Sequence, residues 1–182
     1  FKLFLAAEPH FPASNYLFPG IDYNGNTPGR NTPLGWEKDG EPWIFAYDRG
    51  SIPSCTISEN EGHVFALFAS DCDRVSHESS CSMEKLGDGS FRHLIYWPVT
   101  EAPLTYSNKL EFTERYDTYL TLEPGKELTV SAFACQGIPL WPEYGFTAVF
   151  PVAWKRLHHE IQPQRSVSEV LRLDKAYQDW GR

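Results

Sequence analysis

The stretch DGEPWIFAYDRGSIPSCTISENEGHVFALFAS, residues 39–70, decides the fold of this chain, because it predicts three strands separated by two turns. In the first strand, residues 42–47, side chains alternate between the two faces of an extended backbone. Trp43, Phe45 and Tyr47 therefore fall on one face. We expect this aromatic face to pack onto a core.

Glycines mark both turns of the stretch. Gly50 and Gly62 can take the positive φ that a tight turn or a hairpin requires. A second, short strand is expected at residues 54–57 and a third at residues 63–70. The third is apolar on both faces, which is typical of a strand inside a sheet rather than at its edge. The stretch thus predicts an antiparallel meander.

Further strands are expected on both sides of this meander. They lie at residues 1–7, 92–98, 105–112, 115–122 and 127–135. Glu123-Pro124-Gly125-Lys126 has the sequence of a type II turn. Short strands at this spacing predict a mostly β fold, an antiparallel β-sandwich. Its expected core residues are Phe45, Val64, Phe68, Leu94, Leu120 and Val130.

The chain changes character near its C-terminal end. Residues 144–159 fit a strand up to Phe150 or a short helix entered at Pro151, and we expect a strand followed by a helix. We divide the chain into a sandwich domain, residues 1–160, and a linker and helix, residues 161–182.

The expected last helix has an N-terminal capping box, formed by Ser166 and Glu169. Its apolar stripe consists of Val170, Leu173, Tyr177 and Trp180. We expect this helix to lead into a downstream domain of the same polypeptide and to face it. The alternative is that the helix folds back on this domain.

Composition excludes several classes of partner. The 182 residues suit one domain, and 41% are hydrophobic. The net charge is −8, and the only basic cluster is Lys155-Arg156, which argues against nucleic-acid binding. No apolar run is long enough to cross a bilayer. The four cysteines, Cys55, Cys72, Cys81 and Cys135, are interpreted as buried thiols, although two disulfides are also possible by number.

A long irregular segment, residues 10–40, holds the candidate binding residues. Its rings and amides can stack on a sugar and bind its hydroxyl groups. The candidates are Tyr23, Asn24, Asn26 and Trp36. The alternative is an ordered cap whose polar side chains satisfy their own turns. Arg49 is interpreted first as a structural ion-pair partner and second as a sugar contact.

No catalytic signature is present. The sequence lacks GxSxG, HExxH, a glycine-rich phosphate loop and CxxC, so we expect no cofactor and no metal. His63 and His93 fall on expected strands and are interpreted as structural. The carboxylates near turns, Asp22, Asp39, Asp48 and Glu101, show no pairing that would assign an acid and a base.

Four motifs carry a resemblance to a known family. They are Tyr23-Asn24-Gly25-Asn26, Trp36, WIFAYDRGSIPSCT at residues 43–56, and Leu122-Glu123-Pro124-Gly125. With them the chain resembles the N-terminal β-sandwich, of the supersandwich type, of bacterial six-hairpin glycosidases. The resemblance implies a downstream helical toroid that bears the catalytic acid and base. It implies no catalytic residue on this chain.

Three functions fit these observations. The first is an accessory, noncatalytic sandwich that supports a glycoside hydrolase domain and lends a loop to its cleft. The second is a free-standing carbohydrate-binding module. The third is a small complete hydrolase that uses loop carboxylates. We expect the first, and therefore no glycosidase activity from the chain alone.

Overall fold

The computed structural model describes residues 1–23, 37–38, 41–60, 62–70, 78–106 and 112–157. The expected helix after Ser166 lies outside these residues, and so do Asn24, Asn26 and Trp36 of the candidate sugar-binding residues. Within them the chain forms two main antiparallel sheets, three small strand pairs and one α-helix.

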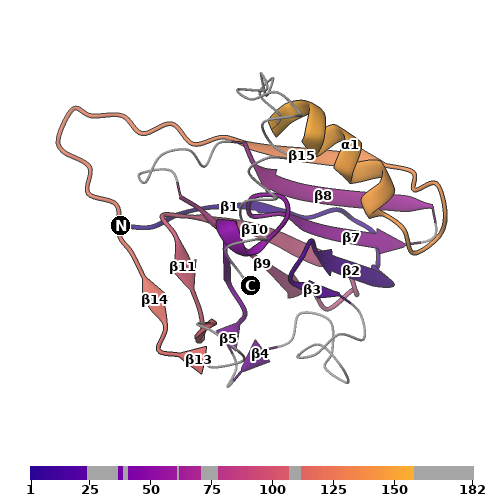
Figure 1. The fold of residues 1–182 in the computed structure, drawn as a ribbon, viewed down its shortest axis with the longest axis horizontal. Coiled ribbons are helices and arrows are strands. Elements are labelled where there is room, and N and C mark those ends of the chain that lie inside the picture. Colours follow the sequence, from indigo (N-terminus) through magenta and orange to yellow (C-terminus); the bar gives the residue numbers. More distant parts are fainter. Residues whose placement is uncertain (24–36, 39–40, 61, 71–77, 107–111, 158–182) are drawn as a thin grey trace, which may run out of the picture.

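The two main sheets face each other and form a β-sandwich (Figure 1). Sheet A contains, from edge to edge, β1 (Leu3–Ala7), β10 (Phe91–Trp97), β9 (Ser80–Lys85) and β6 (Phe45–Ala46). Sheet B contains β15 (Ala132–Gly137), β8 (His63–Ala69), β7 (Thr56–Asn60), β2 (Asn15–Phe18) and β3 (Asp22–Tyr23). All pairings are antiparallel, so the predicted fold class is confirmed.

Smaller elements complete the fold. The three strand pairs are β4 (Glu37–Lys38) with β5 (Glu41–Pro42), β11 (Thr100–Glu101) with β14 (Tyr116–Asp117), and β12 (Thr105–Tyr106) with β13 (Phe112–Thr113). A 3-10 helix, η1 (Tyr47–Arg49), follows β6. The helix α1 (Phe146–Leu157) lies along β15 and β8 of sheet B (Figure 1).

Strand β8 is apolar on both faces because each face packs against a different layer of the molecule. Phe65 and Leu67 point into the core between the two sheets, beside Ile95 and Trp97 of β10. Val64, Ala66 and Phe68 point the other way, towards Val149 and Ala153 of α1. The strand is flanked by β7 and β15, which confirms that it lies inside the sheet. The molecule therefore has three layers: sheet A, sheet B and α1.

The expected core residues separate into two groups. Val64, Phe68 and Leu94 are buried. Phe45, Leu120 and Val130 are half-buried at the margins of the core clusters. The hairpin between β7 and β8 and the 123–126 turn form as predicted, with φ of +81° at Gly62 and +79° at Gly125.

Three strands of the two main sheets form where the sequence predicted none. β2 and β3 fall inside the expected loop of residues 10–40, and Tyr16 and Phe18 of β2 enter the core beside β9. β9 carries serines on buried positions, which hid it from a hydrophobic pattern. Ser82 satisfies its hydroxyl by donating to the Trp43 carbonyl, and the Ser80 hydroxyl accepts the Thr100 N–H.

Several expected elements were wrong in extent. The strand at residues 42–47 is reduced to Phe45–Ala46, because η1 turns the chain at Tyr47. The strand at 54–57 moves to Thr56–Asn60, and the one at 127–135 moves to Ala132–Gly137. Of the strand expected at 115–122, only Tyr116–Asp117 forms.

The expected strand before Phe150 was also wrong. α1 begins at Phe146 and contains Pro151 in its interior. Pro151 is exposed, and its missing N–H costs the helix the hydrogen bond to the Thr147 carbonyl. Burial of Val149 and Ala153 on the sheet stabilises the helix in spite of that loss.

Candidate functional site

Of the four candidate sugar-binding residues in the 10–40 segment, Tyr23 is the one that the structure describes, and it does so for the backbone alone. The backbone of Tyr23 pairs with Leu17 at the free edge of sheet B. Asn24, Asn26 and Trp36 lie outside the described residues. Their role in sugar binding therefore stays a prediction, and Arg49 is the candidate whose side chain can be placed.

Arg49 forms a bidentate ion pair with Glu101. Its Nε lies 2.6 Å from Oε1, and its Nη2 lies 3.0 Å from Oε2. The Glu101 side chain is 6% exposed and that of Arg49 is 33% exposed. The pair joins η1 to β11, so the structural interpretation of Arg49 is confirmed. A sugar contact by its solvent-facing part stays a prediction.

His93 is the most enclosed ionisable group of the sandwich. Its ring has no exposed surface, and both nitrogens lie 2.8 Å from hydroxyl groups, Nδ1 from Thr56 and Nε2 from Ser58. Burial lowers the pKa of His93 from 6.5 to about 3. The neutral ring thus connects β10 of sheet A to β7 of sheet B. It is a structural histidine, as expected, and His63 is exposed elsewhere on β8.

The cysteines of the described chain are free thiols. Cys55 and Cys81 are buried, and burial raises the pKa of both thiols well above the ordinary value of a cysteine. Burial also raises the pKa of Cys135, which is half-buried. A nucleophilic cysteine needs a lowered pKa and access to substrate. None of the three has a lowered pKa, and Cys55 and Cys81 also lack access to substrate. Cys72 lies outside the described residues.

Glu59 holds the entrance to α1. Its two carboxylate oxygens accept the backbone N–H groups of Glu143, at 2.7 Å, and Gly145, at 2.6 Å. The residue is 4% exposed. An anion at a helix N-terminus is stabilised by the orphan N–H groups and by the helix dipole. Sequence reasoning missed this contact because Glu59 is more than eighty residues away from both donors in the sequence.

The two loop carboxylates whose side chains the structure describes, Asp48 and Glu101, belong to different elements. Asp48 is exposed on η1, while Glu101 is engaged by Arg49 on β11. The side chain of Asp22 and the whole of Asp39 lie outside the described part of the structure. Acid and base pairs in glycoside hydrolases face each other across a scissile bond. The structure assigns no acid or base role to Asp48 or Glu101, and within the described residues no three or more His, Cys, Asp or Glu side chains form a group that could hold a metal ion.

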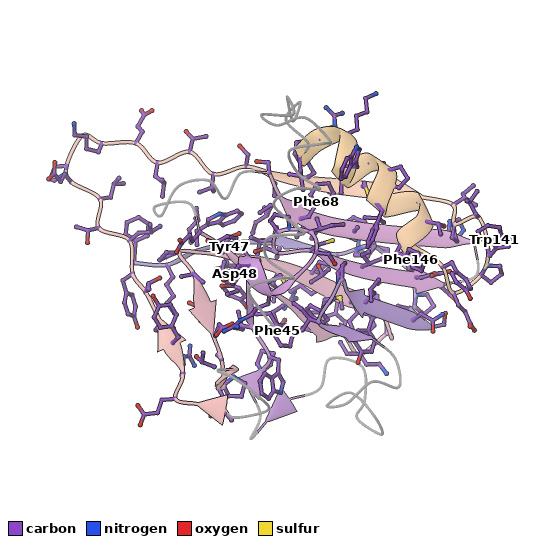
Figure 2. The ribbon with its side chains drawn as sticks, viewed as in Figure 1. Phe45, Tyr47, Asp48, Phe68, Trp141 and Phe146 are labelled. Atoms are coloured by element: carbon purple, nitrogen blue, oxygen red, sulfur yellow. The ribbon has the colours of Figure 1, made fainter. Side chains whose placement is uncertain are left out.

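A second feature that sequence reasoning missed is a row of aromatic side chains along α1 and the loop before it. We call it the aromatic row, and its members are Trp141, Tyr144, Phe146, Phe150 and Trp154. Successive ring centroids from Trp141 to Phe150 lie 6.3, 5.7 and 5.6 Å apart. Figure 2 shows Trp141 and Phe146 at the end of the molecule where the chain enters α1.

The row continues to the other end of the helix. Phe146, Phe150 and Trp154 are four residues apart, so they share one side of α1. Phe150 and Trp154 line a surface hollow of about 260 Å³. That spacing was the signal in the sequence. It was obscured because the residues before Phe150 were expected to be a strand.

Comparison with protein-family models, with curated proteins and with solved structures found no match for this chain. Within its described ranges the chain has no helix that is long and apolar enough to cross a membrane.

Proposed function

We propose that this chain is a noncatalytic β-sandwich module that accompanies a glycoside hydrolase domain. The observation that supports the proposal is that the buried ionisable groups serve the fold. His93 joins the sheets, Glu59 holds α1, and Glu101 pairs with Arg49.

Catalysis places different demands on such groups. A general acid or base must reach a proton of the substrate within hydrogen-bond distance. A histidine whose two nitrogens are bonded inside the core does not reach one, and neither does a carboxylate whose oxygens both accept backbone N–H groups. The three described thiols are kept protonated by burial. The chain is thus suited to support or binding.

The carbohydrate context comes from the family resemblance of the loop motifs. In this proposal the partners are a downstream helical domain of the same polypeptide and an oligo- or polysaccharide. The loop that starts at Tyr23, with Asn24, Asn26 and Trp36, contacts the sugar from the free edge of sheet B. Arg49 contributes the solvent-facing part of its guanidinium group.

Hydrolysis assays test the noncatalytic assignment. The chain is assayed on aryl glycosides and polysaccharides, alone and within the polypeptide that continues beyond Arg182. We expect turnover only from the longer polypeptide. Turnover by the chain alone that is lost in Asp48→Asn, with the fold intact, contradicts the proposal and favours a small complete hydrolase.

Binding assays test the sugar contact separately. Retention of the chain on a glycan surface is measured for the natural sequence and for Trp36→Ala, with Trp141→Ala as a matched control outside the loop. We expect Trp36→Ala alone to lower binding. Equal binding by both variants contradicts the loop assignment.

A further inference from the structure

Strand β1 is an exposed apolar strand at the edge of sheet A. It is the last strand of that sheet and pairs with β10 on one side. In the described part of the chain, no backbone hydrogen bond joins residues 3–7 to an element other than β10. Leu3 is 38% exposed, Phe4 63% and Leu5 42%. Natural proteins usually protect such an edge with charges, prolines or a cover, because its free N–H and C=O groups pair with other strands.

The apolar side chains of β1 are exposed on both faces of sheet A. Leu5 pairs with Ile95 of β10, which is buried between the two sheets. Residues directly opposite each other on neighbouring strands share a face, so Leu5 and Leu3 lie on the inner face. Phe4 lies on the outer face, with its ring centroid 6.3 Å from that of Tyr96. A strand that joined this edge would therefore bury apolar surface on both faces.

The open edge has a defined length. Pro9 follows closely after the strand and has no N–H to donate, so it ends any further pairing. At the other end, the carbonyl of Phe1 accepts the N–H of Leu120 at 2.9 Å. The five residues of β1 lie between these two positions. Five residues are a usual strand length, so the edge can accept one complete strand.

The sequence of β1 is complementary to itself in an antiparallel pair. When two copies of β1 are aligned about Leu5, Phe4 of one copy lies opposite Ala6 of the second copy. Leu3 lies opposite Ala7 in the same way, so each large side chain meets a small one. This alignment pairs odd positions with odd and even with even, which keeps inner and outer faces continuous. Alignment about Phe4 would instead oppose two phenylalanines.

The charges that flank β1 fit the same alignment. Lys2, before the strand, lies opposite Glu8, after the strand, of the second copy. Within its own copy Lys2 forms an ion pair with Asp117. Glu8 forms one with Arg92. Each end of the aligned pair thus carries four charges of alternating sign, and opposite charges on facing positions stabilise a strand pair. Charge complementarity therefore favours a second copy of this chain as the occupant of the edge.

We propose that β1 is a dimerisation strand. Two copies of the chain pair antiparallel through β1, about a two-fold axis at Leu5, and their two four-stranded A sheets become one continuous sheet. An interface that uses the same surface on both copies closes after two subunits. A pair of short strands is a small interface, so the dimer is a weak one. This inference does not depend on the carbohydrate function, and its test uses no activity.

Sedimentation of the full chain tests the dimer. Between about 1 μM and about 1 mM, the range of weak interfaces, the mass should rise from 20.8 kDa towards twice that value. Leu5→Lys places two like charges on the axis and should weaken dimerisation about tenfold or more. Leu122→Lys is the matched control, because Leu122 is 43% exposed and lies outside β1. It should dimerise like the natural sequence.

Disulfide cross-linking tests the register, and it decides the matter even where Leu5→Lys fails to fold. Leu5→Cys should link two copies under mild oxidation, because facing Cα atoms lie about 4.5–5.5 Å apart. Phe4→Cys alone should not, because the two cysteines would be diagonal neighbours about 7–8 Å apart. A mixture of Phe4→Cys and Ala6→Cys chains should link again. The natural sequence, oxidised in parallel, measures the background from its own four cysteines.

The proposal is wrong if the natural chain keeps a mass of 20.8 kDa over the whole concentration range. It is also wrong if the chain dimerises but Leu5→Lys and Leu122→Lys dimerise equally well, since the dimer then uses another surface. Linking of Phe4→Cys alone as efficiently as Leu5→Cys would contradict the alignment about Leu5.

Discussion

A carboxylate oxygen of Glu59 accepts the backbone N–H of Gly145 at 2.6 Å. This hydrogen bond ties the end of β7 to the residue that immediately precedes α1. The second oxygen accepts the N–H of Glu143, so one side chain fixes the turn through which the chain enters the helix. The direction of α1, and with it the position of the aromatic row, therefore depends on Glu59.

Glu59→Ala should destabilise the fold. It removes a charged acceptor from two backbone N–H groups, and a buried donor left unsatisfied costs about 1–3 kcal/mol. Chemical denaturation measures the change in the free energy of unfolding. The control is Glu84→Ala, which removes a surface ion pair with Arg92 and should change stability little. Equal effects of the two substitutions would contradict the role of Glu59.

Gly145→Ala should also destabilise the fold, because it changes the residue whose N–H donates to Glu59. An added Cβ would lie 2.7 Å from Oε2 of Glu59 and 2.8 Å from Cγ2 of Val64. Neither neighbour can retreat freely, because the first is hydrogen-bonded and the second is packed under α1. A lower melting temperature is expected. Gly87→Ala is the control, because an added Cβ there meets no atom within 4 Å, and it should melt close to the natural sequence.

Because of His93, the free energy of unfolding should decrease as the pH is lowered. The pKa of His93 is about 3 in the folded protein, against an ordinary value of 6.5. The unfolded chain therefore binds a proton that the folded chain does not hold between these values. His93 has its full stabilising effect above pH 6.5, and the effect is lost as the pH falls towards 3, with a slope of at most about 1.4 kcal/mol per pH unit.

Comparison with a variant isolates this contribution from that of the carboxylates. His93→Gln does not titrate in this range, so its free energy of unfolding should depend less steeply on pH between 6 and 4. Urea denaturation at several pH values gives both slopes. Identical slopes would show that His93 is not the titrating group.

Arg49 and Glu101 should be energetically coupled in the folded protein. Arg49→Ala leaves a buried carboxylate without its counter-charge, and breaking a fully buried pair costs about 3–5 kcal/mol. Because Arg49 is one-third exposed, we expect a smaller loss, on the order of 2 kcal/mol. A double-mutant cycle with Glu101→Gln measures the coupling. Additive effects of the two substitutions would contradict a direct interaction.

The buried thiols should not react in the folded protein. Cys55 and Cys81 are 2% and 1% exposed, and burial raises the pKa of each thiol. Iodoacetamide followed by mass spectrometry should label them only after unfolding, and a reductant should leave the melting temperature unchanged. Rapid labelling of the native protein would contradict their placement in the core.

Local patterns were sufficient to predict the centre of the sandwich. Strand β8 and its hairpin with β7 follow from an apolar run after Gly62, and β10 follows from the alternation around Leu94. Those signals are local, because neighbouring residues carry the period of the strand. The ion pair of Arg49 was also anticipated from chemistry, although its partner was not.

Long-range contacts explain what the sequence did not reveal. β9 packs serines at buried positions, and their partners, such as the carbonyl of Trp43, come from distant segments. The start of α1 depends on Glu59, and the aromatic row could be predicted only from a helix that begins at Phe146. Of the sugar candidates, Asn24, Asn26 and Trp36 lie outside the described residues.

The two-faced strand β8 has a consequence for synthesis on the ribosome. Its outer face, with Val64 and Phe68, packs against Val149 and Ala153 of α1, which ends at Leu157, and its neighbour β15 is also made late. At about 5–20 residues per second, the face lacks its cover by α1 for roughly 4–18 s after Ala69 is added. During this interval the nascent chain presents an apolar sheet surface that chaperones recognise, so truncation before α1 should yield aggregates instead of a smaller domain.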